Sequence, residues 1–157
     1  MSGFGVMAAM LLGCATPPAV DVGAEFRRGM EALHAQRFRE AEEAFGHVLA
    51  VAPNDAETQY LMGYTEAALG DLKGARKHYE RAEKNHKDPV QVYRELGITY
   101  AKLGMRHEAE GQLEMLRLLR DACAGTCSRA GFIAGAVDAV AAAIAELDGV
   151  TGLQGHR

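Results

Sequence analysis

The chain has 157 residues, of which 48% are apolar and 24% charged, and its formal net charge at pH 7 is −4. This composition is typical of a globular protein, and the acidic balance excludes a general basic field that would attract nucleic acid. The most cationic stretch, residues 73–87, has two glutamates among its six Lys and Arg residues, so we interpret it as a solvated helix face rather than a phosphate-binding patch. No run approaches the roughly 20 apolar residues of a bilayer-spanning helix.

The N-terminal segment leads through the sequence LLGC at residues 11–14 into TPP at residues 16–18. It resembles the bacterial lipobox, in which a short apolar segment precedes Leu-x-Gly-Cys and cleavage falls before the cysteine. The resemblance implies that residues 1–13 are a signal peptide, that Cys14 carries lipid, and that residues 14–21 are a tether. Several acyl chains hold a protein on a membrane, whereas a single chain binds only marginally.

A second interpretation leaves this segment unprocessed. The first three residues contain no Lys or Arg, and the 13 residues before Cys14 are short for a signal peptide. In this alternative the apolar strip packs on the first folded unit, and Cys14 is a small buried hydrophobic residue.

From residue 22 onward the sequence repeats with a period of 34. Three columns share this spacing: Gly29, Gly63 and Gly97; Ala41, Ala75 and Ala109; and Phe45, Tyr79 and Leu113. In such a repeat each unit buries its apolar face only by stacking on its neighbours.

The pattern resembles the tetratricopeptide repeat, a helix-turn-helix unit of 34 residues. The best matches are YRELGITYAKLG at residues 93–104 and GARKHYERA at residues 74–82, whereas Arg28 and Leu113 depart from the family pattern. The resemblance implies an all-α fold, an α-solenoid of three units at residues 22–55, 56–89 and 90–123.

Local signals divide each unit into two helices. We expect breaks at residues 36–37, 70–71 and 104–105, where two glycines suit a left-handed C-terminal cap. Asp55 and Asp88 are expected N-caps, with Pro89 at a first helical position.

Cys123 and Cys127 follow the third unit in the sequence CAGTC. If Cys14 is lipidated, two cysteines remain in an oxidising compartment, and their spacing permits the Cα separation of roughly 4.4–6.8 Å that a disulfide needs. A structural disulfide is the favoured interpretation, and free thiols or redox or metal chemistry remain alternatives.

Residues 128–149 are predicted to form a helix that caps the open end of the stack. Ser128 would cap its start and Gly149 its end, with residues 150–157 as a frayed tail. Apolar residues recur along one side at helical spacing: Phe132, Ile133, Ala136, Val137, Val140, Ile144 and Leu147.

No sequence pattern indicates catalysis. The chain has no phosphate loop, no Gly-x-Ser-x-Gly and no histidine pair at metal-ligand spacing. We therefore expect a protein that is not an enzyme and has no cofactor, metal or small-molecule substrate.

In tetratricopeptide proteins the first helices line a concave groove that binds a protein or peptide segment. Helical spacing selects candidate groove residues on the face away from the Gly/Ala columns, apolar and aromatic first and cationic last: Phe26, Met30, His34, Tyr60, Tyr64, Arg94, Ile98 and Lys102. Such a surface suits a segment with an apolar anchor and a carboxylate near Arg94 and Lys102. Alternatively, Phe26, Met30 and Tyr60 pack against the N-terminal segment or one another.

One binding mode of the family is missing. Co-chaperones of this family hold a C-terminal carboxylate with Lys and Asn side chains, and the matching positions here are Phe26, Met30, Leu61, Gln91 and Glu95.

The sequence therefore predicts a non-catalytic adaptor that binds a protein or peptide segment. The lipobox resemblance places it as a lipoprotein on the outer membrane, facing the periplasm, where it would assist assembly of a pilus, a secretion channel or the outer-membrane insertion machinery. The alternative is a soluble cytoplasmic scaffold or regulatory subunit without lipid.

Overall fold

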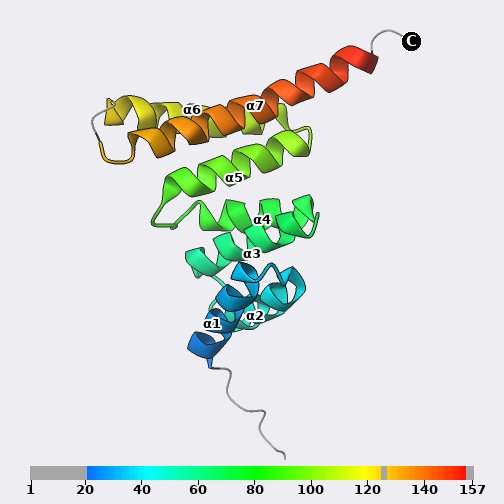
Figure 1. The fold of residues 1–157 in the computed structure, drawn as a ribbon, viewed down its shortest axis with the longest axis vertical. Coiled ribbons are helices and arrows are strands. Elements are labelled where there is room, and N and C mark those ends of the chain that lie inside the picture. Colours follow the sequence, from blue (N-terminus) through cyan, green and yellow to red (C-terminus); the bar gives the residue numbers. More distant parts are fainter. Residues whose placement is uncertain (1–20, 125–126, 155–157) are drawn as a thin grey trace, which may run out of the picture.

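The computed structural model describes residues 21–124 and 127–154. Within these residues the chain forms seven helices and no strand, which confirms the all-α prediction. Six helices form three antiparallel hairpins that stack one after another, and α7 closes the far end (Figure 1). The helices are α1 (Val22–His34), α2 (Phe38–Val51), α3 (Ala56–Ala68), α4 (Leu72–Ala82), α5 (Pro89–Lys102), α6 (Arg106–Cys123) and α7 (Ala130–Gln154).

The chain reverses within each hairpin at the three predicted breaks. Gln36, Gly70 and Gly104 have φ angles of 57°, 87° and 76°, the left-handed conformation that ends a helix and redirects the chain. Glycine adopts this conformation without strain, whereas Gln36 does so against its own steric preference.

The predicted N-caps differ from each other in the structure. Asp55 caps α3 as expected, because its Oδ1 accepts a hydrogen bond from the Thr58 amide at 2.8 Å. Asp88 precedes α5 and Pro89 begins it, but the Asp88 side chain makes no cap bond. Its Oδ2 instead accepts from Arg129 Nη2 at 2.7 Å, so this carboxylate ties the start of α5 to the chain just before α7. Asp88 thus occupies the predicted N-cap position, but its side chain does not bond the helix amides.

The glycine column marks where helices approach most closely. A Cβ atom on Gly29 would lie 2.5 Å from the Phe45 ring, and one on Gly63 would lie 2.8 Å from the Tyr79 ring. Both rings are fully buried. In the first two hairpins, therefore, an aromatic residue of the second helix fills the space that glycine leaves on the first.

The third hairpin fills this space differently. A Cβ on Gly97 would meet Val140 of α7 at 2.8 Å, and Val140 is completely buried. Leu113 stands in the aromatic column and is buried too. Leu113 replaces the aromatic residue of the first two hairpins, and Val140 of α7 fills the space beside Gly97 instead.

Helix α7 packs along both α5 and α6. It buries one stripe of residues: Ile133, Ala136, Val137, Val140 and Ile144. Phe132 was expected in this stripe but is 42% exposed. It precedes the buried Ile133 and lies on the solvent side of the helix, where the Arg129 guanidinium is 4.8 Å from its ring centroid.

The predicted ends of the capping helix need correction. The helix begins at Ala130 rather than at Ser128, and it continues through Gly149 to Gln154, so residues 150–154 are helical rather than frayed. Gly149 has no positive φ and therefore does not end the helix. The expectation that no segment resembles a bilayer-spanning helix also needs correction. Among the described helices, α7 alone is long and apolar enough to cross a membrane by composition, over Ala130–Leu147, and its buried stripe faces α5 and α6.

The predicted signal peptide at residues 1–13, Cys14 and the tether up to residue 20 lie outside the described residues.

Candidate peptide-binding face

The eight candidate groove residues lie on α1, α3 and α5, the first helices of successive hairpins (Figure 1). Phe26 and Met30 are half-buried and pack against a core cluster that includes Phe45. The Phe26 and Phe45 ring centroids are 6.1 Å apart. These two side chains therefore fill space between α1 and α2 more than they present a free surface.

Tyr60 is also half-buried and bridges two neighbours. Its ring centroid lies 5.8 Å from that of Tyr79 and 5.0 Å from that of His86. Tyr60, like Phe26 and Met30, therefore packs against core side chains, here Tyr79 and His86.

The accessible part of the face is formed by other candidates. Tyr64 is 44% exposed, which is high for a large aromatic side chain, and the Arg94 side chain is 43% exposed. His34 and Lys102 are exposed at the C-terminal ends of their helices, whereas Ile98 is half-buried against the core.

Arg94 is paired with a neighbour that we did not select from the sequence. Its Nη1 donates to Glu95 Oε1 at 2.8 Å, and the Glu95 side chain is only 17% exposed. Burial raises the pKa of Glu95 above its ordinary value, and the positive charges of Arg94 and Lys102 oppose this shift. The sequence signal for this pair is an acidic residue directly after Arg94 at the edge of the predicted face.

Two tyrosine hydroxyls share the electrostatic environment of Glu95. Burial raises the pKa of both Tyr60 and Tyr79, and in each case the Glu95 carboxylate adds to the shift. Tyr79 is fully buried, and its hydroxyl has no hydrogen-bond partner among the described residues. These phenols remain neutral, so the groups that influence Glu95 from these two positions carry no charge.

The positions of the carboxylate clamp hold no cation. Leu61 is buried with 7% exposure, and Glu95 places a negative charge where that clamp needs a positive one. This face therefore needs another mode of recognition.

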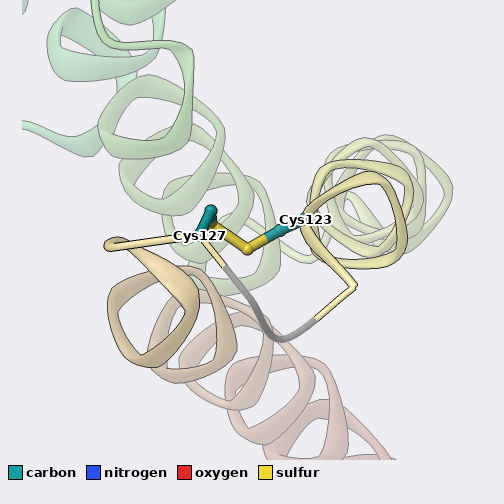
Figure 2. Close-up of a disulfide and its surroundings, with 2 residues drawn as sticks. All are labelled: Cys123 and Cys127. Atoms are coloured by element: carbon teal, nitrogen blue, oxygen red, sulfur yellow. A yellow bond between two sulfur atoms is a disulfide. The ribbon is translucent and has the colours of Figure 1, made fainter.

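A disulfide lies at the far end of the stack. Cys123 ends α6 and Cys127 precedes α7, and Figure 2 shows their sulfur atoms joined across the turn, with Cα atoms 5.4 Å apart. The bond links the last hairpin covalently to its cap. The described residues contain no group of three or more His, Cys, Asp or Glu side chains placed to hold a metal ion.

Comparison with known proteins identifies the family of the chain. The sequence model of the tetratricopeptide repeat matches residues 26–91 and 60–116, which together span most of the three hairpins. The chain belongs to the tetratricopeptide repeat family. A search of curated proteins finds no match.

Two solved structures share the fold of this tetratricopeptide protein. The TPR2B domain of yeast Sti1, determined in complex with pHsp70, superposes with a TM-score of 0.61 at 20% identity, covering 76% of this chain and 95% of that one. MamA superposes with a TM-score of 0.58 at 16% identity, covering 87% of this chain and 82% of that one. At these identities the likeness shows the fold alone.

Proposed function

We propose that the protein is a non-catalytic adaptor that binds a segment of a partner protein on the face formed by α1, α3 and α5. The observation that carries this proposal is the exposed Tyr64 ring on α3 together with the Arg94 side chain on α5, which is 43% exposed. The other apolar and aromatic candidates on this face are half-buried: Phe26, Met30, Tyr60 and Ile98. An exposed aromatic ring and an arginine are the side chains most often found at the energetic centre of protein interfaces.

The chemistry of the face suits an extended segment with an apolar anchor and a nearby carboxylate. The anchor packs on Tyr64, and the carboxylate approaches Arg94, with Lys102 about two turns farther along α5. Glu95 already pairs with Arg94, so a partner carboxylate competes with Glu95 for the guanidinium. Glu95 thereby lowers the affinity for acidic segments and selects those that also use the apolar anchor.

Because of this competition, substitutions at Arg94 and Glu95 should change the affinity for the partner in opposite directions. The partner is captured from envelope extract of the native host with wild-type protein, identified, and its affinity is then measured with Tyr64→Ala, Arg94→Ala and Glu95→Gln. We expect the first two substitutions to weaken binding roughly tenfold or more and Glu95→Gln to strengthen it.

The matched controls are Val51→Ala, an exposed apolar side chain on α2, and Arg117→Ala, an exposed cation on α6. Both should leave the affinity unchanged. Equal losses in the controls, or no effect of Tyr64→Ala and Arg94→Ala, would place the binding site elsewhere.

We further propose that the adaptor is a lipoprotein of the cell envelope, anchored through Cys14 and facing the periplasm, where it assists assembly of a pilus, a secretion channel or the outer-membrane insertion machinery. The lipobox-like sequence at residues 11–14 supports this location. A disulfide between Cys123 and Cys127 suits an oxidising compartment.

Intact mass before and after reduction tests the location. A chain that begins at Cys14 with added acyl mass, and gains about 2 Da on reduction as a disulfide opens, is the expected result. An unprocessed chain without lipid would instead support the alternative, a cytoplasmic scaffold or regulatory subunit.

A further inference from the structure

The second helices of the three hairpins expose equivalent positions that recur every 34 residues on their outer side. All twelve residues at these positions are solvent-exposed. They are Arg39, Glu43, His47 and Ala50 on α2; Lys73, Lys77, Arg81 and Lys84 on α4 and its C-terminal turn; and His107, Gly111, Met115 and Leu118 on α6.

The α4 positions hold four cations and no acid. None of Lys73, Lys77, Arg81 and Lys84 forms a salt bridge with the described residues. Four arginines do have a carboxylate within 4.0 Å: Arg37, Arg39, Arg76 and Arg106. Glu80 is already bonded to Tyr100 and Arg76, and Glu83 accepts from Gln112. In a chain of net charge −4, these four cations form a local positive stripe.

The α6 positions break the polar pattern of the outer surface. Met115 is 40% exposed and Leu118 is 54% exposed, whereas the same positions hold Arg81 and Lys84 one repeat earlier. The core does not need these two side chains, because α6 buries Ala109, Leu113 and Leu116 on its other side.

The cationic and apolar positions belong to one continuous surface. Gln112 Nε2 on α6 donates to Glu83 Oε1, at the C-terminal cap of α4, at 3.0 Å, and this bond links the outer surfaces of the two helices. We call this surface the outer face, defined by Lys73, Lys77, Arg81, Lys84, Met115 and Leu118. On the far side of α6 it ends at the exposed Glu114.

We propose that the outer face contacts the surface of a membrane rich in anionic phospholipids. This proposal revises the solvated-face interpretation of residues 73–87, because the glutamates in that stretch, Glu80 and Glu83, bond to other side chains. The four cations of α4 meet the phosphate headgroups, and Met115 and Leu118 enter the boundary between headgroups and acyl chains. Each basic residue close to an anionic leaflet raises partitioning about fivefold, so four of them bind measurably at physiological salt. A bilayer offers negative charge and apolar depth together, whereas nucleic acid offers no apolar depth beside its phosphates.

This contact goes beyond the proposed adaptor function and does not depend on it. The outer face lies on second helices, so the face of α1, α3 and α5 remains free for a partner while α4 and α6 rest on the bilayer. Membrane contact through the outer face would orient the stack on the bilayer.

The test is sedimentation of full-length protein carrying Cys14→Ser, which removes any lipid, with vesicles of phosphatidylcholine and phosphatidylglycerol at a 3:1 ratio. We expect binding to these vesicles, weak binding to pure phosphatidylcholine, and loss of binding in 0.5 M NaCl, because salt screens exposed charges. Lys77→Glu with Lys84→Glu should lower the partition coefficient about 30-fold or more. Met115→Ser with Leu118→Ser should lower the partition coefficient by a smaller factor than the lysine variant does. This smaller decrease should appear at every salt concentration.

The matched control is Arg27→Glu with Arg117→Glu, which changes the net charge equally at exposed cations away from the outer face. Far-UV circular dichroism confirms that each variant is folded. Equal loss of binding in the control pair would show a general charge effect and overturn the proposal. Failure of the parent protein to bind phosphatidylglycerol vesicles would also overturn it and assign the outer face to an acidic protein partner.

Discussion

The contact between Gly97 and Val140 predicts a measurable energetic coupling between α5 and α7. Val140→Ala removes two buried methyl groups from a fully buried side chain. Their transfer accounts for about 1.6 kcal/mol, and the remaining cavity brings the expected loss of unfolding free energy to about 2–3 kcal/mol.

Gly97→Ala perturbs the same contact from the other side. The new methyl group would lie 2.8 Å from Val140 Cγ1 and 3.2 Å from Gln112 Cβ, so a neighbour must move. Overpacking of this kind costs about 1–3 kcal/mol, against a gain of about 1 kcal/mol in helix propensity from replacing glycine. In the double variant the methyl group added at position 97 occupies space that the valine side chain vacates, so we expect the loss to fall short of the sum of the single losses by about 1–2 kcal/mol.

The assay is urea unfolding of all four proteins, followed by far-UV circular dichroism. Gly63→Ala combined with Val140→Ala is the control, because a methyl on Gly63 meets Tyr79 and not α7, and its effect should be additive. Additivity of Gly97→Ala with Val140→Ala, within experimental error, would refute the packing of α7 against α5.

Three further predictions concern Glu95, the disulfide and the cap of α3. Burial raises the folded-state pKa of Glu95, so the folded state keeps this proton to a higher pH than the unfolded state does, and Glu95 makes the free energy of unfolding fall as pH rises above its ordinary pKa of 4.5. Glu95→Gln should remove this decline and raise the urea midpoint at pH 7. An unchanged pH profile of stability would contradict the assignment. Replacing Cys123 and Cys127 with serine should lower the unfolding free energy by about 2 kcal/mol in the absence of reductant, as measured by urea unfolding, whereas identical curves for both proteins would show that the disulfide does not form in solution. Asp55→Ala should cost about 1 kcal/mol in thermal or urea unfolding through loss of the bond to the Thr58 amide, and a cost near zero would show that this cap is not formed.

Periodicity predicted the hairpins because the repeat constrains backbone and packing together. Gly70 and Gly104 could be assigned as helix ends from residue type alone, and Gly29 and Gly63 as close-packing positions from their columns. The partner of Gly97 could not be predicted, because it comes from α7, which lies outside the 34-residue period. A Leu in the aromatic column was the available signal that another element completes that packing site.

The candidate face was harder to predict than the fold. Helical spacing selects a side of a helix, but it does not distinguish an exposed ring such as Tyr64 from a half-buried one such as Phe26. That difference depends on the packing partners of each ring: Phe26 packs against Phe45 on α2, whereas part of α3 stays open at Tyr64. Glu95 was not selected as a groove residue for the same reason, since its burial arises only when the helices pack together.

The most direct test of the central claim is site-specific photo-cross-linking in cells of the native host. A benzophenone amino acid replaces Tyr64 on α3 in one strain and Ala50, an exposed residue on the outer side of α2, in another. The account predicts a discrete cross-linked partner from position 64 that is lost when Arg94→Ala is added, and none from position 50. The same adduct from both positions, or no adduct from position 64, would contradict the assignment of this face as the binding site.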